Sequence, residues 1–256
     1  MSTMTALSRA EFTLLGRNRV LLFNAIVMPL VFPVALLIIG TRNGGLTDAG
    51  VAAALQSFAL LLLVFVVFYN LLSVYATRRD ELVLKRLRTG ESTDAQILLG
   101  PAVPSLLLCV ILSVVVGGVV VAFGGGVPVN VLLVALALAG GAVLFGALAL
   151  ITSAFTRNAE AAQITSLPVV LLAMVGTPLV RDAVPAALGD VISLTPLAAV
   201  TDLLNLGWFG TVTPGGAPHG FAGTFSGAGA PVLVMLAWIT GCVLIARTHF
   251  RWEPRF

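Results

Sequence analysis

Few residues of this chain could bind the phosphates of a nucleotide, and their spacing excludes a P-loop. A P-loop needs Gly-Lys followed by Ser or Thr, because the lysine reaches the phosphates of the bound nucleotide. The chain has a single lysine, Lys85, and it follows Leu84. We therefore predict that this chain is not an enzyme and has no ATPase motif of its own.

The other side chains that could do chemistry are isolated from one another. His219 lies in a Gly-rich stretch and His249 at the end of an apolar segment, and neither has a Cys, Asp or Glu partner at metal-ligand spacing. Cys109 and Cys242 fall inside apolar runs, where a thiol packs as a small hydrophobic group. We expect this chain to bind no metal and no cofactor.

The elements that must position all of these residues are apolar helices of membrane length. Hydrophobic residues make up 59% of the 256 residues and charged residues 10%, whereas a soluble domain carries about 25% charged residues. A transmembrane helix needs about 20 mostly apolar residues. Six segments meet this requirement: Val20–Gly40, Val51–Tyr75, Ile97–Phe123, Val131–Phe155, Ala161–Val180 and Pro231–Thr248. The sequence predicts an all-α membrane protein with six transmembrane helices in one transmembrane domain, residues 1–256, surrounded by the lipid bilayer.

The segments outside these spans also suggest structure. Residues 1–19 contain a capping-box pattern, Ser8 to Glu11, and predict a short interfacial helix. An extension of the first transmembrane helix is the alternative. Residues 181–230 form the longest connection. Its first part, Ala183–Phe209, is apolar but interrupted by Pro and Gly, which predicts short helices dipping into the outer interface between helices 5 and 6. Gly210–Gly229 reads as a flexible loop, and residues 231–256 form helix 6 and a tail.

The basic residues predict the orientation. Twelve of the 14 Lys and Arg residues fall on one side of the six-span arrangement, and only Arg42 and Arg181 fall on the other. Basic residues accumulate on the cytoplasmic side of a membrane. We expect both termini to be cytoplasmic and, because arginine so outnumbers lysine, the membrane to be the cytoplasmic membrane of a G+C-rich bacterium. Because the basic residues flank apolar spans, the net charge of +3 does not indicate nucleic-acid binding.

A transporter driven by protons or sodium ions usually carries carboxylates inside the membrane. The six predicted spans contain none. If the protein moves a solute uphill, the energy is therefore expected to come from a partner.

One cytoplasmic loop, Ala76–Ala95, concentrates charge. Leu82, Leu84 and Leu87 are interspersed with its charged residues, which is typical of an amphipathic helix. A solvated loop that merely follows the positive-inside rule gives the same composition, so both interpretations remain open at this level.

Three stretches together resemble the ABC-2 type permeases. The run Arg79-Asp80-Glu81-Leu82-Val83-Leu84-Lys85-Arg86-Leu87-Arg88, followed by Gln96-Ile97-Leu98-Leu99-Gly100, is similar to the family's Arg-Glu-x-Gly-Thr-Leu-x-x-Leu-Arg loop and Ile-Leu-Leu-Gly helix entry. Ser153–Gln163 with Pro168 is the second stretch. The third is Val184-Pro185 with Ile192–Leu197 and Asp202. The chain departs from the family where Leu82-Val83 replace Gly-Thr and Gly90-Glu91 replace Thr-Pro.

The resemblance implies a permease subunit of an ATP-binding-cassette exporter. Two permeases, identical copies or paralogues, would work with two ATPase subunits that bind ATP and Mg²⁺. The charged loop would be a coupling helix docked on the ATPase, with these contact residues: Arg79, Asp80, Glu81, Leu84, Lys85, Leu87 and Arg88. Similarity to drug-exporting permeases suggests drug efflux and antibiotic resistance.

The cargo is expected to be amphiphilic, such as a drug, an antibiotic or a lipid-like molecule, because the spans offer aromatic and weakly polar groups without fixed charge. The candidate path residues are Phe65, Phe68, Tyr69, Asn70, Met174 and Thr177, although core packing explains such residues equally well. Two other classes of function compete with the exporter. One is a secondary transporter or channel uncoupled from ATP, and the other is a membrane-embedded enzyme or assembly protein.

Overall fold

The computed structural model describes residues 19–83, 93–158, 160–213 and 215–249, and within these ranges the chain forms helices and no strands. The predicted interfacial helix of residues 1–19 lies almost entirely outside them. In chain order the helices are α2 (Arg19–Arg42), α3 (Asp48–Leu61), the π-helix η1 (Leu62–Tyr69), α4 (Asn70–Asp80), α6 (Asp94–Leu99), α7 (Ala102–Ala122), α8 (Val131–Phe155), α9 (Ala161–Thr165), α10 (Leu167–Val175), α11 (Pro178–Arg181), α12 (Ala186–Ile192), α13 (Pro196–Phe209) and α14 (Thr224–His249).

Five helical segments are long and apolar enough to cross a bilayer, and they correspond to five of the six predicted spans. They are Ala25–Arg42, Asp48–Asp80, Ala102–Ala122, Val131–Phe155 and Thr224–His249. The fourth span has the predicted bounds. The third is shorter than predicted, because a break at Gly100-Pro101 separates α6 from α7. The last begins earlier than predicted, so the Gly-rich loop ends before Thr224.

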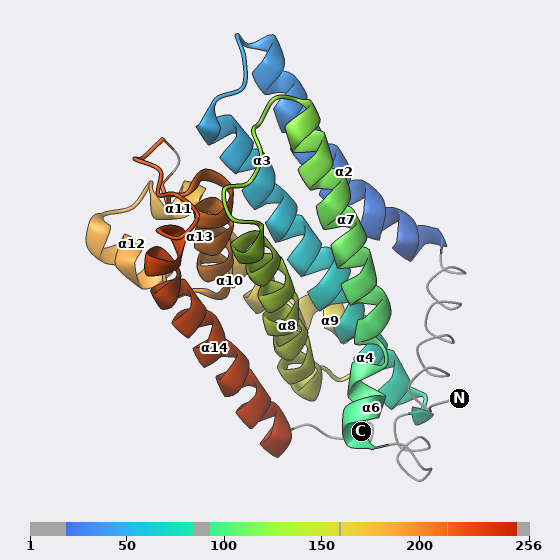
Figure 1. The fold of residues 1–256 in the computed structure, drawn as a ribbon. Coiled ribbons are helices and arrows are strands. Elements are labelled where there is room, and N and C mark those ends of the chain that lie inside the picture. The colour runs from blue at the N-terminus through green and yellow to red at the C-terminus, as the bar shows by residue number, and fades with distance from the viewer. Residues whose placement is uncertain (1–18, 84–92, 159, 214, 250–256) are drawn as a thin grey trace.

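Figure 1 shows α8 between α7 and α14, with the continuous helix α3–η1–α4 packed behind it. The contacts agree: α8 packs against η1, α4, α13 and α14, and α2 packs against α3 and α7. We call the end of the bundle where α4 and α8 terminate the Arg79 end. The opposite end, where α8 and α14 begin, is the Asn130 end.

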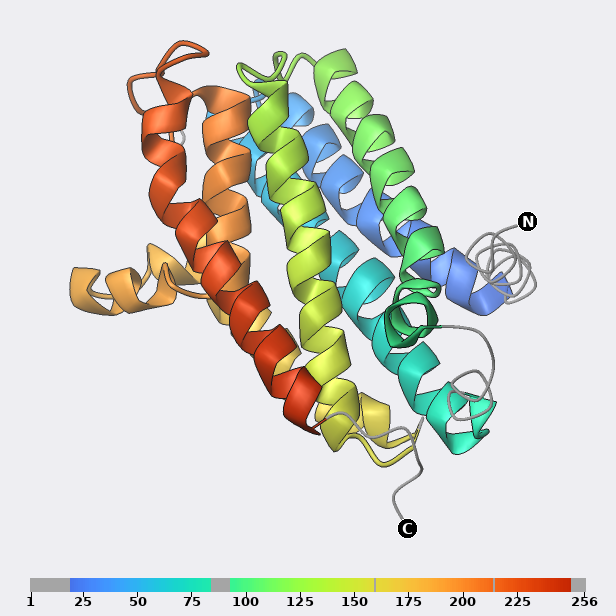
Figure 2. The same cartoon turned by 60° about the horizontal axis from the view of Figure 1, so that its bottom comes forward.

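The predicted fifth span, Ala161–Val180, is wrong as a continuous helix. Its apolar helical part is only Ala161–Val175, shorter than a span, and is itself divided between α9 and α10. Pro178 explains the end of α10, because the residue before a proline is disfavoured in helical geometry. Thr177 is accordingly extended, with φ −72° and ψ 144°. The chain then leaves the bundle as α11 and α12, which project sideways in Figure 2.

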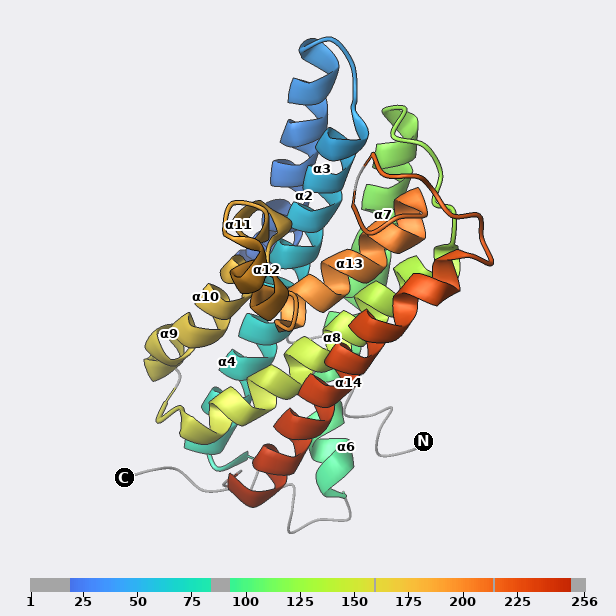
Figure 3. The same ribbon diagram turned by 90° about the vertical axis from the view of Figure 1, so that its left-hand side faces the viewer.

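The helix α13 completes the path that α10 begins. α10 and α13 run in the same direction, one after the other (Figure 3), and a Cβ on Gly176 at the end of α10 would lie 2.4 Å from the Oγ1 of Thr195, just before α13. α12 and α13 are long and apolar enough for a membrane span only when taken together, and a 94° bend separates them. The described residues thus contain five continuous spans, and any sixth would be built from broken helices.

The burial of α13 differs from the interfacial position that we predicted for Ala183–Phe209. Every residue of α13 except Phe209 is buried, against α8, α14 and α3. Gly207 permits this close approach, because a Cβ there would lie 2.8 Å from the backbone nitrogen of Val134 on α8. By contrast, α12 buries none of its residues.

The Asn130 end is joined by hydrogen bonds between three segments. The Oδ1 of Asn130 caps α8 by accepting from the backbone N–H of Leu132 and Leu133, at 3.0 and 3.2 Å. Its Nδ2 donates to the Oγ1 of Thr224 at the start of α14, at 2.8 Å, and its backbone N–H donates to the carbonyl of Gly207 at 2.8 Å. This end is thereby held together independently of the Arg79 end.

Candidate functional site

The charged loop predicted to act as a coupling helix leaves the bundle at the end of α4, next to a buried arginine. Arg79 is only 1% exposed, and its guanidinium donates to the backbone carbonyls of Ser153, at 2.7 Å, and Thr156. Ser153 lies in the last turn of α8 and Thr156 directly follows it. Carbonyls at the end of a helix lack the partners of a continuing helix and carry partial negative charge. The planar guanidinium fork can donate to both at once.

The same turn of α8 is also connected to α9. The Oγ1 of Thr156 donates to the carbonyl of Thr152 at 2.8 Å and lies 2.8 Å from the Oγ1 of Thr165, the last residue of α9. Arg79 and Thr156 therefore join α4, α8 and α9 into one polar cluster, which we call the Arg79 cluster. The cluster therefore connects the end of α4 directly to the end of α8 and to α9.

The remaining coupling residues are exposed or lie outside the described ranges. Asp80 and Glu81 are exposed at the end of α4, while Arg79 points into the bundle. Leu84, Lys85, Leu87 and Arg88 lie in the undescribed segment 84–92. Contact of this loop with an ATPase stays a prediction. Arg79, however, contacts carbonyls of its own chain instead of facing outward toward a partner.

The departure of Leu82 from the family pattern has a conformational consequence. Leu82 has φ 58°, in the left-handed region that favours glycine. Its backbone N–H donates to the carbonyl of Arg79 at 3.1 Å, so it occupies the turn that ends α4. The family's glycine at this position matches the geometry, and leucine imposes strain at the start of the loop.

We expect Leu82→Gly to stabilise the protein by about 1 kcal/mol, the approximate cost of left-handed geometry for a residue with a Cβ. Glu81→Gly is the matched control, since Glu81 has φ −79° and glycine there should cost about 0.5–1 kcal/mol. Thermal unfolding in lipid nanodiscs checks both changes. Equal destabilisation by the two variants would refute the strain at Leu82.

A largely buried ion pair lies at the break in the helical path. The guanidinium of Arg181, at the end of α11, makes a bidentate contact with the carboxylate of Asp202 on α13, at 2.9 and 2.8 Å. The sequence assigned Arg181 to an outer loop, whereas its side chain is only 16% exposed. The pair fixes the projecting segment α11–α12 to the buried helix α13.

Asp202 also corrects an argument made from the sequence. The predicted spans contain no carboxylate, but α13, which was not predicted as a span, brings Asp202 into the bundle with 8% exposure. Arg181 neutralises Asp202 through one charge-assisted hydrogen bond, from Nη1 to Oδ2, and an ion-pair contact from Nη2 to Oδ1, so the carboxylate already has a partner within the chain.

The six candidate path residues have different environments. Phe68 is buried in the core, whereas Phe65 and Met174 are 43% and 52% exposed. Asn70 donates to the Oγ of Ser105 at 2.7 Å, which satisfies a buried amide next to the π-helix. Tyr69 is half-buried, and the hydroxyl of Thr177 donates to the carbonyl of Met174 at 2.7 Å. These contacts explain Phe68 and Asn70 by packing, and a common path through all six stays a prediction.

Potential metal ligands remain scattered in the described part of the chain. No three His, Cys, Asp or Glu side chains gather there in a way that could hold a metal ion. Cys109 and Cys242 are both buried as free thiols. His249 packs its ring against Phe155, with centroids 5.9 Å apart.

The fold and this polar cluster define a multi-pass helical membrane protein in which the end of α4, just before the charged loop, is anchored to α8. A family model described as ABC-2 type transporter matches residues 3–206. The chain therefore belongs to the ABC-2 type transporter family, and it is a membrane permease of an ABC-type transporter. Permeases of this family generally work with ABC ATPase subunits. The comparison with curated proteins finds no match.

Proposed function

We propose that the chain is the permease subunit of an ABC exporter, which moves an amphiphilic solute outward and takes its energy from a separate ATPase. Two permeases and two ATPases would form the working unit, with ATP and Mg²⁺ bound by the ATPases. The observation that carries this proposal is the Arg79 cluster, because it ties the end of α4, from which the charged loop continues, to α8 and α9. A loop that only marks topology needs no such anchor.

The cluster supports a route from the ATPase to the helices. ATP binding would bring the two ATPase subunits together and displace the loop after α4. Arg79 would pass this displacement to the end of α8, and the contact between Thr156 and Thr165 would pass it to α9 and α10. A path already broken between α10 and α13 can change its packing at the break without unfolding a continuous helix.

The orientation is the second part of the proposal: the Arg79 end faces the cytoplasm of a bacterium. Twelve of the 14 basic residues support it. We expect Gly216→Cys, at the Asn130 end, to react with a membrane-impermeant maleimide in intact cells, and Asn158→Cys to stay unlabelled until the cells are opened. Labelling of Asn158→Cys from outside would reverse the assignment.

We expect Leu84→Asp and Leu87→Asp to disrupt export, because a lost leucine contact in an interface costs about 1–3 kcal/mol. Transport in proteoliposomes and co-purification of the ATPase measure the effect. Arg157→Ala is the control. Arg157 is exposed at the same end of the bundle, and an exposed charge contributes little.

Two results would contradict the coupling assignment. If both leucine variants transport normally and still bind the ATPase, the loop is a solvated topological signal. Export by the purified chain without any ATPase subunit would instead favour a secondary transporter or channel.

A further inference from the structure

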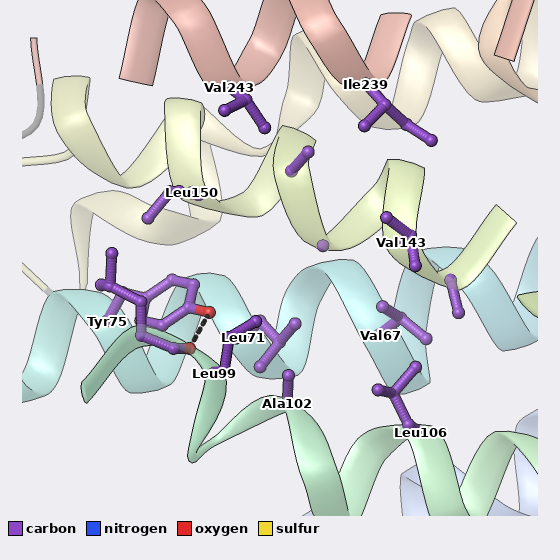
Figure 4. Close-up of a pocket in the computed structure, with 14 residues that line it drawn as sticks. Val67, Leu71, Tyr75, Leu99, Ala102, Leu106, Val143, Leu150, Ile239 and Val243 are labelled. Atoms are coloured by element: carbon purple, nitrogen blue, oxygen red, sulfur yellow. Dashed lines mark hydrogen bonds between the residues drawn. The ribbon is translucent and has the colours of Figure 1, made fainter. Parts of the chain in front are cut away.

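An apolar groove runs along α8, about one helical turn from the Arg79 cluster, and shares none of its residues. It has a volume of about 190 Å³ and lies between α14 and the α6–α7 elbow, with η1 and α4 as its floor. Figure 4 shows Val143 and Leu150 of α8 facing Val67, Leu71 and Tyr75 across it. None of the six candidate path residues lines it.

The groove opens to the outside of the bundle. Three of its lining residues, Leu99, Val143 and Leu106, are 55%, 52% and 37% exposed. Its polar group, the hydroxyl of Tyr75, donates to the carbonyl of Leu98 at 2.8 Å and so presents no unsatisfied donor. In a membrane-spanning bundle, an exposed wall of this kind faces hydrocarbon, which favours an aliphatic occupant.

The length of the groove matches one leaflet. Its floor extends from Val67 to Tyr75, which at 1.5 Å per residue spans about 12 Å, and half of a bilayer's hydrocarbon core is about 15 Å thick. The groove lies along the second half of α8, from Ala142 to Leu150, so it belongs to the leaflet at the Arg79 end.

A cation lies one helical turn beyond the groove, toward the Arg79 end. Ile239 and Val243 of α14 line it, and Arg247 follows Val243 by four residues, on the same face of the helix. Arg247 is exposed in the last turn of α14. A lipid whose acyl chain fills the groove would therefore bring its phosphate near a guanidinium, which binds phosphate strongly.

We infer that this groove is a binding site for an anionic phospholipid, which inserts one acyl chain between α7, α8 and α14 and pairs its phosphate with Arg247. Assignment of the lipid to the cytoplasmic leaflet rests on the proposed orientation. The site itself does not depend on export, so it is tested on the permease alone.

Gly146 allows the groove to be filled without disturbing the packing. A Cβ on Gly146 would lie 3.5 Å from the nearest atom, on Leu71, which is an ordinary contact, and a longer side chain would extend into the groove. Gly146→Leu is therefore the filling variant. Gly241→Leu on α14 is its control, because a Cβ there meets nothing within 4 Å.

The experiment uses purified permease in nanodiscs that contain phosphatidylglycerol with a diazirine in its acyl chain. Labelled residues are identified by mass spectrometry, with unlabelled phosphatidylglycerol or phosphatidylcholine as competitor. We expect labelling of α8 and α14 at the groove, displaced by phosphatidylglycerol more readily than by phosphatidylcholine. Gly146→Leu should reduce it to background, and Arg247→Gln should weaken binding about fivefold. Gly241→Leu and Arg42→Gln, which removes a cation at the opposite end, should change neither.

Three outcomes would overturn the inference. Labelling that Gly146→Leu leaves unchanged would indicate ordinary surrounding lipid. Equal competition by both lipids, with no effect of Arg247→Gln, would remove the anionic headgroup from the site. A groove protected from the photolipid, together with disulfide formation between copies that carry Val143→Cys, would assign it to a second permease. Unchanged melting temperatures of the variants keep these outcomes separate from misfolding.

Discussion

Arg181→Met should destabilise the protein by about 3 kcal/mol, the lower end of the cost of breaking a buried ion pair from one side. The change leaves the carboxylate of Asp202 on α13 without its bidentate partner, at 12% side-chain exposure. Asp202→Leu should cost less, since the long arginine side chain can turn its head toward water or lipid headgroups. Thermal unfolding in nanodiscs measures both changes.

The double variant Arg181→Met/Asp202→Leu distinguishes the interaction between the two charges from the effect of each residue alone. We expect it to recover most of the stability that Arg181→Met loses, because two apolar side chains leave no buried charge behind. A double variant as unstable as the sum of the two single changes would show that the carboxylate and the guanidinium act independently. In that case the pair does not fix α11–α12 to α13.

The apolar spans were predictable because their signals are local. The Asn130 side chain caps α8 at the residue before the predicted start, and the predicted end, Phe155, precedes an extended Thr156 with ψ 131°. Pro178 and Pro196 mark breaks by the same kind of local signal. The structure adds a capping box from Thr93 to Gln96, which begins α6 and was not predicted. The fifth span was wrongly predicted as continuous because its overall apolarity was given more weight than Pro178, which ends α10.

The burial of α13 could not be predicted in the same way, because its polar residues depend on distant partners. Asp202 is neutralised by Arg181, and the Oδ1 of Asn205 accepts from the Nε2 of Gln56, which lies 149 residues away in the chain, at 3.1 Å. Without these partners a segment with Asp and Asn reads as interfacial. Local composition carries no information about such pairs.

Arg79 shows the same limit for the candidate site. The sequence placed it in a charged loop, where an arginine normally lies in solvent. Its burial depends on carbonyls 74 and 77 residues further along the chain, at the end of α8. The charged run did locate the correct segment, but the direction of one side chain within it required the fold.

Arg79→Met should abolish export and cost several kcal/mol of stability, because each hydrogen bond from a charged donor contributes about 1.5–3 kcal/mol. Methionine keeps much of the aliphatic volume and leaves the carbonyls of Ser153 and Thr156 without the guanidinium. Arg79→Lys retains the charge but offers an ammonium in place of the planar fork, so it should recover part of the stability and less of the export. Arg157→Met is the control, because Arg157 directly follows Thr156 but is exposed. Its free energy of unfolding should stay within about 0.5 kcal/mol of the parent's.

The ratio of ATP hydrolysed to solute exported distinguishes transmission from simple stability. If Arg79 carries movement from the loop to α8, the folded fraction of Arg79→Lys should still bind the ATPase and support hydrolysis while exporting less per ATP. A purely structural arginine would lower hydrolysis and export together, in proportion to the folded protein. An Arg79→Lys variant with the parent's ratio of export to hydrolysis would therefore reduce the Arg79 cluster to a structural anchor. The route to the broken path would then have to start elsewhere in the bundle.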